Sequence, residues 1–390
     1  MHLHNISTLS SKLRKSKQIR KAFVTGLWIV FFLFVFDVSI NFLFPYPSDP
    51  LVTSPGQLNL YFEYGRSVEG KLARMIGPTD ELSAPIASAG WLDPQLWKKL
   101  NIPAKRATGE NLLVAIYGMS FSNQMGEAMK EMDAKIGLRL VAGPAAPPNY
   151  AFAAYNLDRG KHQADVAILG ILASSVKAMR TISGLTWNFE APSTFTYPRY
   201  FVENGKLNAI WPKVLSLAQL RTFWQDKQKW NQFVSQMREN DQFFNSFLFE
   251  GNWLDNSAIV RLIRRAYAQR HQMAQANRVH SSNGFNAEIE IPVLRAIVTD
   301  FAAKARSDRK LPIVLLISDR GFEDHLFQAL SPTLETAKIP YVSTHNIAPA
   351  TDIRNFVADG HFTESANKLI AKALLKLINE HFDRRDVLKQ

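Results

Sequence analysis

Residues 112–122 read LLVAIYGMSFS, and this stretch decides the fold class. Its first part, Leu112–Tyr117, is a short continuous apolar run, which is typical of a strand buried on both faces of a parallel sheet. A helical pattern follows from about Ser122 to Ile136. The segment between them, Gly118-Met119-Ser120, therefore lies where a buried strand gives way to a helix.

Similar apolar runs recur along the chain and alternate with helical segments. We expect further strands at Leu138–Ala142, Ala164–Ile171, Leu311–Ser318 and Pro340–Ser343. The last helix, from Glu364 to about Asn379, has apolar residues at helical spacing. This alternation predicts an α/β fold, in which a doubly wound parallel sheet lies between layers of helices.

Residues 185–306 interrupt the alternation between the third and fourth predicted strands. Residues 185–210 are rich in aromatic residues and proline, and residues 213–306 are mostly helical in pattern. Because this stretch is too long for a loop, we expect a helical insertion that covers one edge or mouth of the sheet, within a domain spanning residues 57–390. Its aromatic side chains either stack on sugar rings or pack the insertion itself. They are Trp187, Phe189, Phe195, Tyr197 and Tyr200.

The N-terminal tail, residues 1–21, concentrates the charge of the chain. The net charge is +12 over 390 residues, and this tail contains six lysines and arginines and no acid. The remaining residues are therefore only mildly basic, which argues against nucleic acid as a partner. A basic tail before an apolar helix is instead a topology signal.

Residues 22–44 read AFVTGLWIVFFLFVFDVSINFLF, with Asp37 as the one charged residue. A helix of this length spans roughly 34 Å, enough to cross a bilayer. The alternative is a cleaved signal peptide, but Pro45-Tyr46-Pro47 follows where small residues would mark a cut site. We expect a single-pass anchor in the cytoplasmic membrane, followed by a stiff linker at residues 45–56. The basic tail would stay in the cytoplasm and the large domain outside it, on the periplasmic side in a bacterium.

Several kinds of site are excluded or disfavoured by composition. The chain has no cysteine, which excludes disulfides, thiolate metal sites and a cysteine nucleophile. Its nine histidines show no metal-ligand spacing, and no glycine-rich phosphate loop is present. We therefore expect neither a metal nor a cofactor.

Ser120 is the best candidate for a reactive side chain. Its hydroxyl would project from the carboxyl edge of a parallel sheet, where ligands bind in open α/β folds. The N–H groups of the following helix would face the same point and could stabilise an oxyanion, and Gly118 would let the chain turn tightly. Alternatively, Ser120 or Ser122 simply caps the helix.

A second candidate, Asp359-Gly360-His361, directly precedes the final helix. An aspartate and a histidine close together on a loop can form the acid–base half of a catalytic triad. His345 and Asp352 lie in the loop before Asp359 and could replace it in orienting His361. The alternative is a plain capped turn with an exposed histidine.

Taken together, the two segments resemble the SGNH, or GDSL-type, hydrolase superfamily, whose fold is flavodoxin-like. Gly118-Met119-Ser120 resembles its first motif, with Met119 in place of the usual aspartate, and Asp359-Gly360-His361 resembles its last. The shorter Asp-x-His spacing is similar to that of exopolysaccharide acetylation proteins. The resemblance implies Ser120 as nucleophile, His361 as base and Asp359 as the residue that orients it.

The resemblance also implies where the oxyanion would be held. The family's oxyanion asparagine normally follows a glycine after the third strand, but Gly170 is followed by ILAS, so Ser174 or a backbone N–H would have to substitute. The second donor of the family corresponds to Gly143. The implied function is a serine esterase or O-acyltransferase acting on an acylated polysaccharide of the cell envelope, with any protein partners undetermined. The alternative is a non-catalytic envelope binding or assembly protein that keeps the same fold.

Overall fold

The structure is a computed structural model that describes residues 4–47, 53, 55–76, 90–100, 102–288 and 290–387. Residues 1–3 of the predicted tail, and residues 48–52 and 54 of the predicted linker, lie outside the described residues. The chain forms two compact units, residues 1–75 with 246–269 and residues 76–245 with 270–390. This division cuts across the predicted insertion at 185–306, because residues 246–269 join the N-terminal unit.

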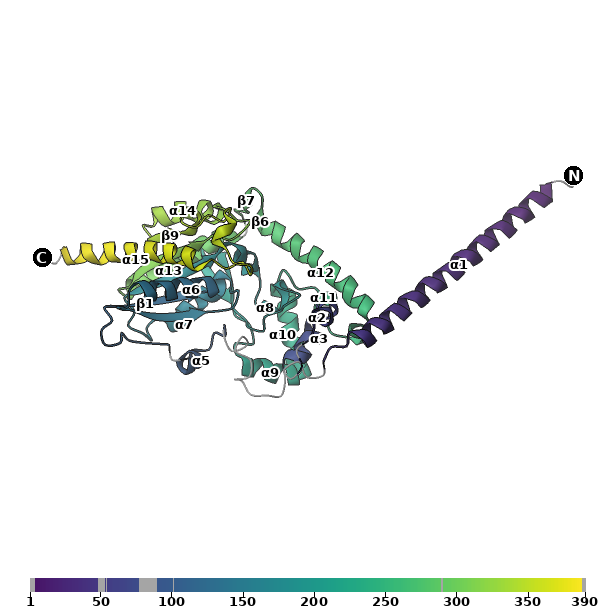
Figure 1. The fold of residues 1–390 in the computed structure, drawn as a ribbon, viewed down its shortest axis with the longest axis horizontal. Coiled ribbons are helices and arrows are strands. Elements are labelled where there is room, and N and C mark those ends of the chain that lie inside the picture. The colour runs from purple at the N-terminus through teal and green to yellow at the C-terminus, as the bar shows by residue number, and fades with distance from the viewer. Residues whose placement is uncertain are drawn as a thin grey trace. The chain divides into compact units, whose positions relative to one another are not determined.

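The larger unit is built on a five-stranded parallel sheet (Figure 1). Its strands are β1 (Leu112–Gly118), β2 (Ile136–Ala142), β3 (Val166–Leu172), β8 (Leu311–Ile317) and β9 (Tyr341–Ser343), in the order β2-β1-β3-β8-β9. In β1, β3 and β8 nearly every residue is buried, as the continuous apolar runs predict. The predicted α/β class with a parallel sheet is confirmed.

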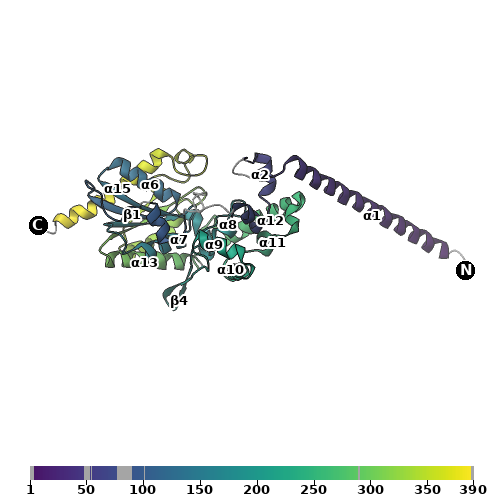
Figure 2. The same ribbon diagram turned by 90° about the horizontal axis from the view of Figure 1, so that it is seen from below.

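Helices flank this sheet on both faces (Figure 2). One face carries α6 (Ser120–Met132) and α15 (Glu364–Val387), which pack against each other. The other carries α7 (Pro148–Asp158) and α13 (Glu290–Ser307), with α14 (His325–Thr336) beside α13. Helices therefore cover the apolar sheet from both sides, as a parallel sheet requires.

Helix α13 lies within the predicted insertion but belongs to the α/β core. Its buried residues Leu294, Ile297 and Phe301 recur at helical spacing, and the helix packs against β3 and β8. It is the crossover helix that leads into β8. The sequence pattern did not separate it from the preceding helices because an inserted helix and a crossover helix have the same apolar period.

The segment between β3 and α13 forms short elements outside the main sheet. These are η1 (Ala173–Arg180), α8 (Gly184–Trp187), the hairpin β4 (Arg199–Glu203) and β5 (Lys206–Ile210), α9 (Leu217–Gln225), α10 (Lys227–Asn240) and the hairpin β6 (His280–Ser281) and β7 (Gly284–Phe285). Among the described residues, no strand from 213–306 joins the five-stranded sheet. Phe189, Phe195, Tyr197 and Tyr200 are buried, so these rings pack the protein interior.

Close packing at the carboxyl edge of the sheet explains why positions 118 and 170 are glycines. A Cβ atom at either Gly118 or Gly170 would overlap the hydroxyl of Ser122, which is fully buried between β1 and β3. Gly118 does not adopt a positive φ, so its requirement is close approach rather than a tight turn. This contact lets the first turn of α6 lie directly on the sheet edge.

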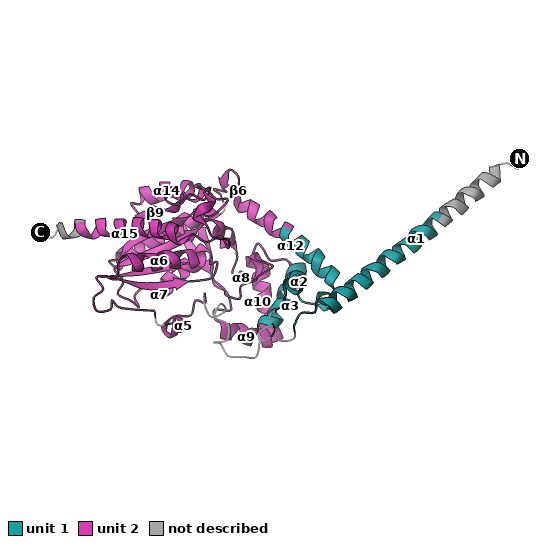
Figure 3. Cartoon of the chain, viewed as in Figure 1, with its two compact units in different colours: residues 1–75, 246–269 teal, residues 76–245, 270–390 magenta. Residues whose placement is uncertain are grey.

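The smaller unit contains α1 (His4–Leu43), α2 (Gln57–Glu63), α3 (Val68–Met75), α11 (Ser246–Phe249), η2 (Trp253–Asn256) and the first part of α12 (Ala258–Val279) (Figure 3). Within α1, the span Gln18–Leu43 has a mean hydropathy of 2.3 and is long and apolar enough to cross a membrane. This is consistent with the predicted single-pass anchor.

Candidate active site

The hydroxyl of Ser120 meets the imidazole of His361 at the carboxyl edge of the sheet. Ser120 Oγ lies 2.7 Å from His361 Nε2, although 241 positions separate the two residues in the chain. Ser120 is the first residue of α6 and follows β1, whereas His361 precedes α15. Because α6 and α15 pack side by side on one face, their N-terminal ends bring the two side chains together.

Aromatic rings hold His361 in place. Its imidazole stacks on Phe121, with 4.7 Å between the ring centroids and 27° between the planes. Phe121 also meets the ring of Phe362 edge-on, and Phe362 stacks on Phe356. The loop is closed by a hydrogen bond of 2.8 Å from the N–H of Val357 to the carbonyl of His361. The imidazole is therefore fixed by packing as well as by Ser120.

Asp359 approaches His361 mainly through the backbone. Its Oδ1 accepts the N–H of His361 at 3.0 Å and lies 3.1 Å from the ring Nδ1. Nδ1 is buried and makes no hydrogen bond of good geometry within the described part of the chain, so this contact is electrostatic. The backbone N–H, followed by the ring, holds the pKa of Asp359 below its usual value. The Asp359 side chain is 69% exposed, which weakens its influence on the ring.

The alternative residues in the same loop point elsewhere. Asp352 pairs with Arg354, whose Nη2 lies 2.8 Å from Oδ2. His345 shares a hydrogen bond of 2.7 Å with Ser343 and stacks on Phe327. Among the described residues, neither is paired with His361, so Asp359 is the carboxylate nearest to the imidazole in sequence and in contact.

Both predicted oxyanion positions have their N–H groups engaged inside the protein. The N–H of Gly143 donates to the carbonyl of Gly118 at 3.1 Å and continues the pairing of β1 with β2. The N–H of Ser174 donates to Asp319 Oδ1, also at 3.1 Å. In this structure neither N–H points freely toward a substrate. The first N–H groups of α6 have no acceptor within the helix, because an α-helix leaves its first turn unpaired.

The loop after β8 adds a charged residue, Arg320, that the sequence did not lead us to assign to the site. Burial raises the pKa of Asp319, which accepts the N–H of Ser174. The next residue, Arg320, is exposed, and its guanidinium lies 5.8 Å from the centre of the Phe356 ring. Its Nη2 is 3.8 Å from where a Cβ of Gly360 would be. A cation therefore borders the loop that carries His361. The position of Arg320 just after β8, at the carboxyl edge of the sheet, was the feature of the sequence that could have identified it.

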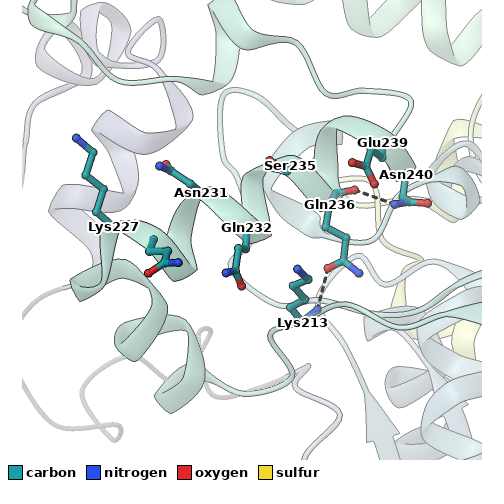
Figure 4. Close-up of a pocket in the computed structure, with 9 residues that line it drawn as sticks. Lys213, Lys227, Asn231, Gln232, Ser235, Gln236, Glu239 and Asn240 are labelled. Carbon is teal, nitrogen blue, oxygen red and sulfur yellow. Dashed lines mark hydrogen bonds between the residues drawn. The ribbon is translucent and has the colours of Figure 1, made fainter.

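A cavity that neither Ser120 nor His361 lines lies over α10 (Figure 4). Its volume is about 770 Å³, and polar side chains line it, including Lys213, Gln232 and Gln236. Gln236 is engaged within the protein, since its Oε1 accepts the N–H of Lys213. Ser120 and His361 instead lie half-buried at the surface. Within the described ranges, no three His, Asp or Glu residues are grouped so that they could hold a metal ion.

No family model and no curated protein matches this chain. A solved structure described as a "putative lipolytic protein of G-D-S-L family" from Desulfitobacterium hafniense DCB-2 matches with a TM-score of 0.31 and 8% identity. The match covers 68% of this chain and 99% of that chain. What the site can do chemically therefore follows from its own geometry.

Proposed function

We propose that this protein is a serine esterase or O-acyltransferase that works through an acyl-enzyme. The hydrogen bond between Ser120 Oγ and His361 Nε2 carries this proposal, because it joins a hydroxyl nucleophile to a base that can take its proton. Attack of Oγ on the ester carbonyl forms the acyl-oxygen bond, and His361 returns the proton to the departing alcohol. Water or a second hydroxyl group then takes the acyl group from Ser120.

The oxyanion would be held by the start of α6. The N–H groups of Ser120 and Phe121 are the first two of the helix, and they can point at the carbonyl oxygen that Ser120 attacks. They replace the expected donors at Gly143 and Ser174, whose N–H groups have internal acceptors. Asp359 would support the charged imidazole during proton transfer, weakly because it is exposed.

The substrate that fits this arrangement is an acyl ester of a cell-envelope polysaccharide. The apolar part of α1 favours a location at a membrane. Arg320 beside the loop that carries His361 favours an anionic polymer as the substrate. The order β2-β1-β3-β8-β9 corresponds to the flavodoxin-like arrangement of doubly wound sheets, with Ser120 beside the switch point between β1 and β3.

In the proposed orientation the large domain lies outside the cytoplasm. A periplasmic reporter fused after residue 60 should therefore be active. Activity of a cytoplasmic reporter at the same point would contradict this orientation.

Labelling with a fluorophosphonate probe tests the activated hydroxyl directly. The wild-type chain should be labelled on Ser120, and Ser120→Ala and His361→Ala should both lose the label. Ser365→Ala, which changes an exposed serine near the same loop, is the matched control and should be labelled like the wild type. Lack of labelling in a folded wild-type chain would contradict the proposal.

The second candidate function is a binding or assembly module that keeps this fold without turnover. The engagement of the N–H groups of Gly143 and Ser174 favours it, because those positions then offer no backbone donor to an oxyanion. Binding of an acylated polysaccharide by an unlabelled wild-type chain would support this alternative.

A further inference from the structure

Asp37, the one charged residue between Ala22 and Phe44, lies near the end of α1 and has hydrogen-bond partners outside that helix. Its Oδ1 accepts hydrogen bonds from Ser257 Oγ at 2.8 Å and from the N–H of Ile259 at 2.9 Å. Ser257 directly precedes α12, and Ile259 lies in its first turn, where the N–H groups of the helix need acceptors. Asp37 therefore caps α12 in the way that an N-cap aspartate does, although it comes from a helix 220 positions earlier.

Asn41, one helical turn further along α1, makes a second set of bonds to the same segment. Its Nδ2 donates to the carbonyl of Asn256 at 3.1 Å, and its Oδ1 accepts from Arg261 Nη2 at 2.6 Å. Arg261 is buried and also pairs with Glu63 of α2. Several hydrogen bonds thus tie the end of the membrane-spanning helix to residues 256–261.

The segment fixed in this way presents large apolar side chains to the outside. Trp253 is 79% exposed, Ile263 57% and Tyr267 41%. Ile263 and Tyr267 are four residues apart on α12, so they lie on the same face of the helix. On the inner side of α12, Arg264 is fully buried and pairs with Asp255. In the first part of α12 two arginines, Arg261 and Arg264, are thus buried while Ile263 and Tyr267 are exposed, and exposed large apolar side chains of this kind mark an interaction surface.

We propose that the surface formed by Trp253, Ile263 and Tyr267 rests in the interfacial layer of the membrane that α1 spans. The hydrogen bonds of Asp37 and Asn41 place this surface beside the end of the anchor, where that helix leaves the bilayer. Tryptophan and tyrosine favour this interfacial layer, and an apolar helix face can lie in it. The smaller unit is then held on the membrane by two contacts instead of hanging from one helix.

Single cysteines provide the test, because the natural chain has none. Spin labels are placed at Trp253→Cys and Ile263→Cys in the full chain, reconstituted into phosphatidylcholine–phosphatidylglycerol vesicles. Ile29→Cys, on the exposed side of α1, is the reference for lipid, and Lys376→Cys, on an exposed part of α15, is the reference for water. Collision with oxygen reports lipid, and collision with a water-soluble nickel chelate reports solvent.

The labels at positions 253 and 263 should show an oxygen-to-nickel ratio at least about threefold above that at position 376, since interfacial residues lie in the headgroup and acyl boundary. A ratio equal to that at position 376 would overturn the proposal. Shielding from both reagents would also overturn it, because a protein and not lipid would then cover the surface. The variants replace exposed side chains and should fold, and the readout does not depend on any enzymatic activity.

Discussion

The ring of Phe121 stacks on the imidazole of His361, and the preceding residue, Ser120, hydrogen-bonds the same imidazole at its edge. Two consecutive side chains at the start of α6 therefore contact both the face and the edge of the ring. In a triad, a buried aspartate normally fixes the imidazole. Here Asp359 is largely exposed, so stacking carries more of that task.

Phe121→Leu tests this positioning role. We expect kcat for hydrolysis of a simple acyl ester to fall by about 10-fold or more with little change in KM, since the imidazole would lose its orientation and not its contact with substrate. Steady-state kinetics on an acetyl ester measure both constants. Phe327→Leu, which removes a similar stack on His345, is the matched control and should leave kcat unchanged. An unchanged kcat in Phe121→Leu would show that stacking does not orient the ring.

Asp359→Asn should have a smaller effect than His361→Ala. We expect a loss in kcat of about 10-fold for Asp359→Asn and about 1,000-fold or more for His361→Ala, because an exposed carboxylate is screened by water. Asp352→Asn removes the partner of Arg354 in the same loop and should behave like the wild type. Equal losses in Asp359→Asn and His361→Ala would indicate that Asp359 orients the ring as strongly as a buried triad aspartate does.

Arg320→Gln should alter substrate preference. Because the Arg320 guanidinium borders Gly360, we expect KM to rise about 5-fold to 10-fold for esters of an anionic polysaccharide and to stay constant for neutral esters at low salt. Arg354→Gln is the matched control, since Arg354 is exposed in the same loop but is paired with Asp352. A similar change for neutral and anionic esters in Arg320→Gln would contradict a role in charge recognition.

The sequence predicted the sheet well because its central strands are continuous apolar runs, as burial on both faces requires. The meeting of Ser120 and His361 was predictable too, since residues that follow parallel strands gather at one edge. Hydrogen-bond partners of the N–H groups of Gly143 and Ser174 were not predictable, because they depend on local backbone geometry. Nor was the contact of Gly170 with Ser122, which joins two strands through a buried side chain.

Asp241 provides a test of stability against pH. It is buried, and its carboxyl group accepts hydrogen bonds from the Thr186 hydroxyl at 2.6 Å and from the N–H of Phe243 at 2.9 Å. Burial raises its pKa from 3.8 to about 7. Between these two values the folded protein holds a proton that the unfolded chain has lost. The contribution of Asp241 is therefore fully present below about pH 4 and decreases as the pH rises to about 7.

We expect Asp241→Asn to gain stability relative to the wild type as the pH rises from 4 to 7, because the amide remains neutral when buried. Linkage sets the upper limit of this gain at roughly 4 kcal/mol. Glu290, whose pKa burial also raises to about 7, acts in the same direction, whereas His162, with its pKa lowered to about 4, acts in the opposite one. Both remain in Asp241→Asn, so the difference in melting temperature between the variant and the wild type isolates Asp241. Asp226→Asn, at an exposed helix cap, is the control and should show no such gain. A constant difference in melting temperature between Asp241→Asn and the wild type from pH 4 to 7 would mean that the buried carboxyl group is ionised throughout this range.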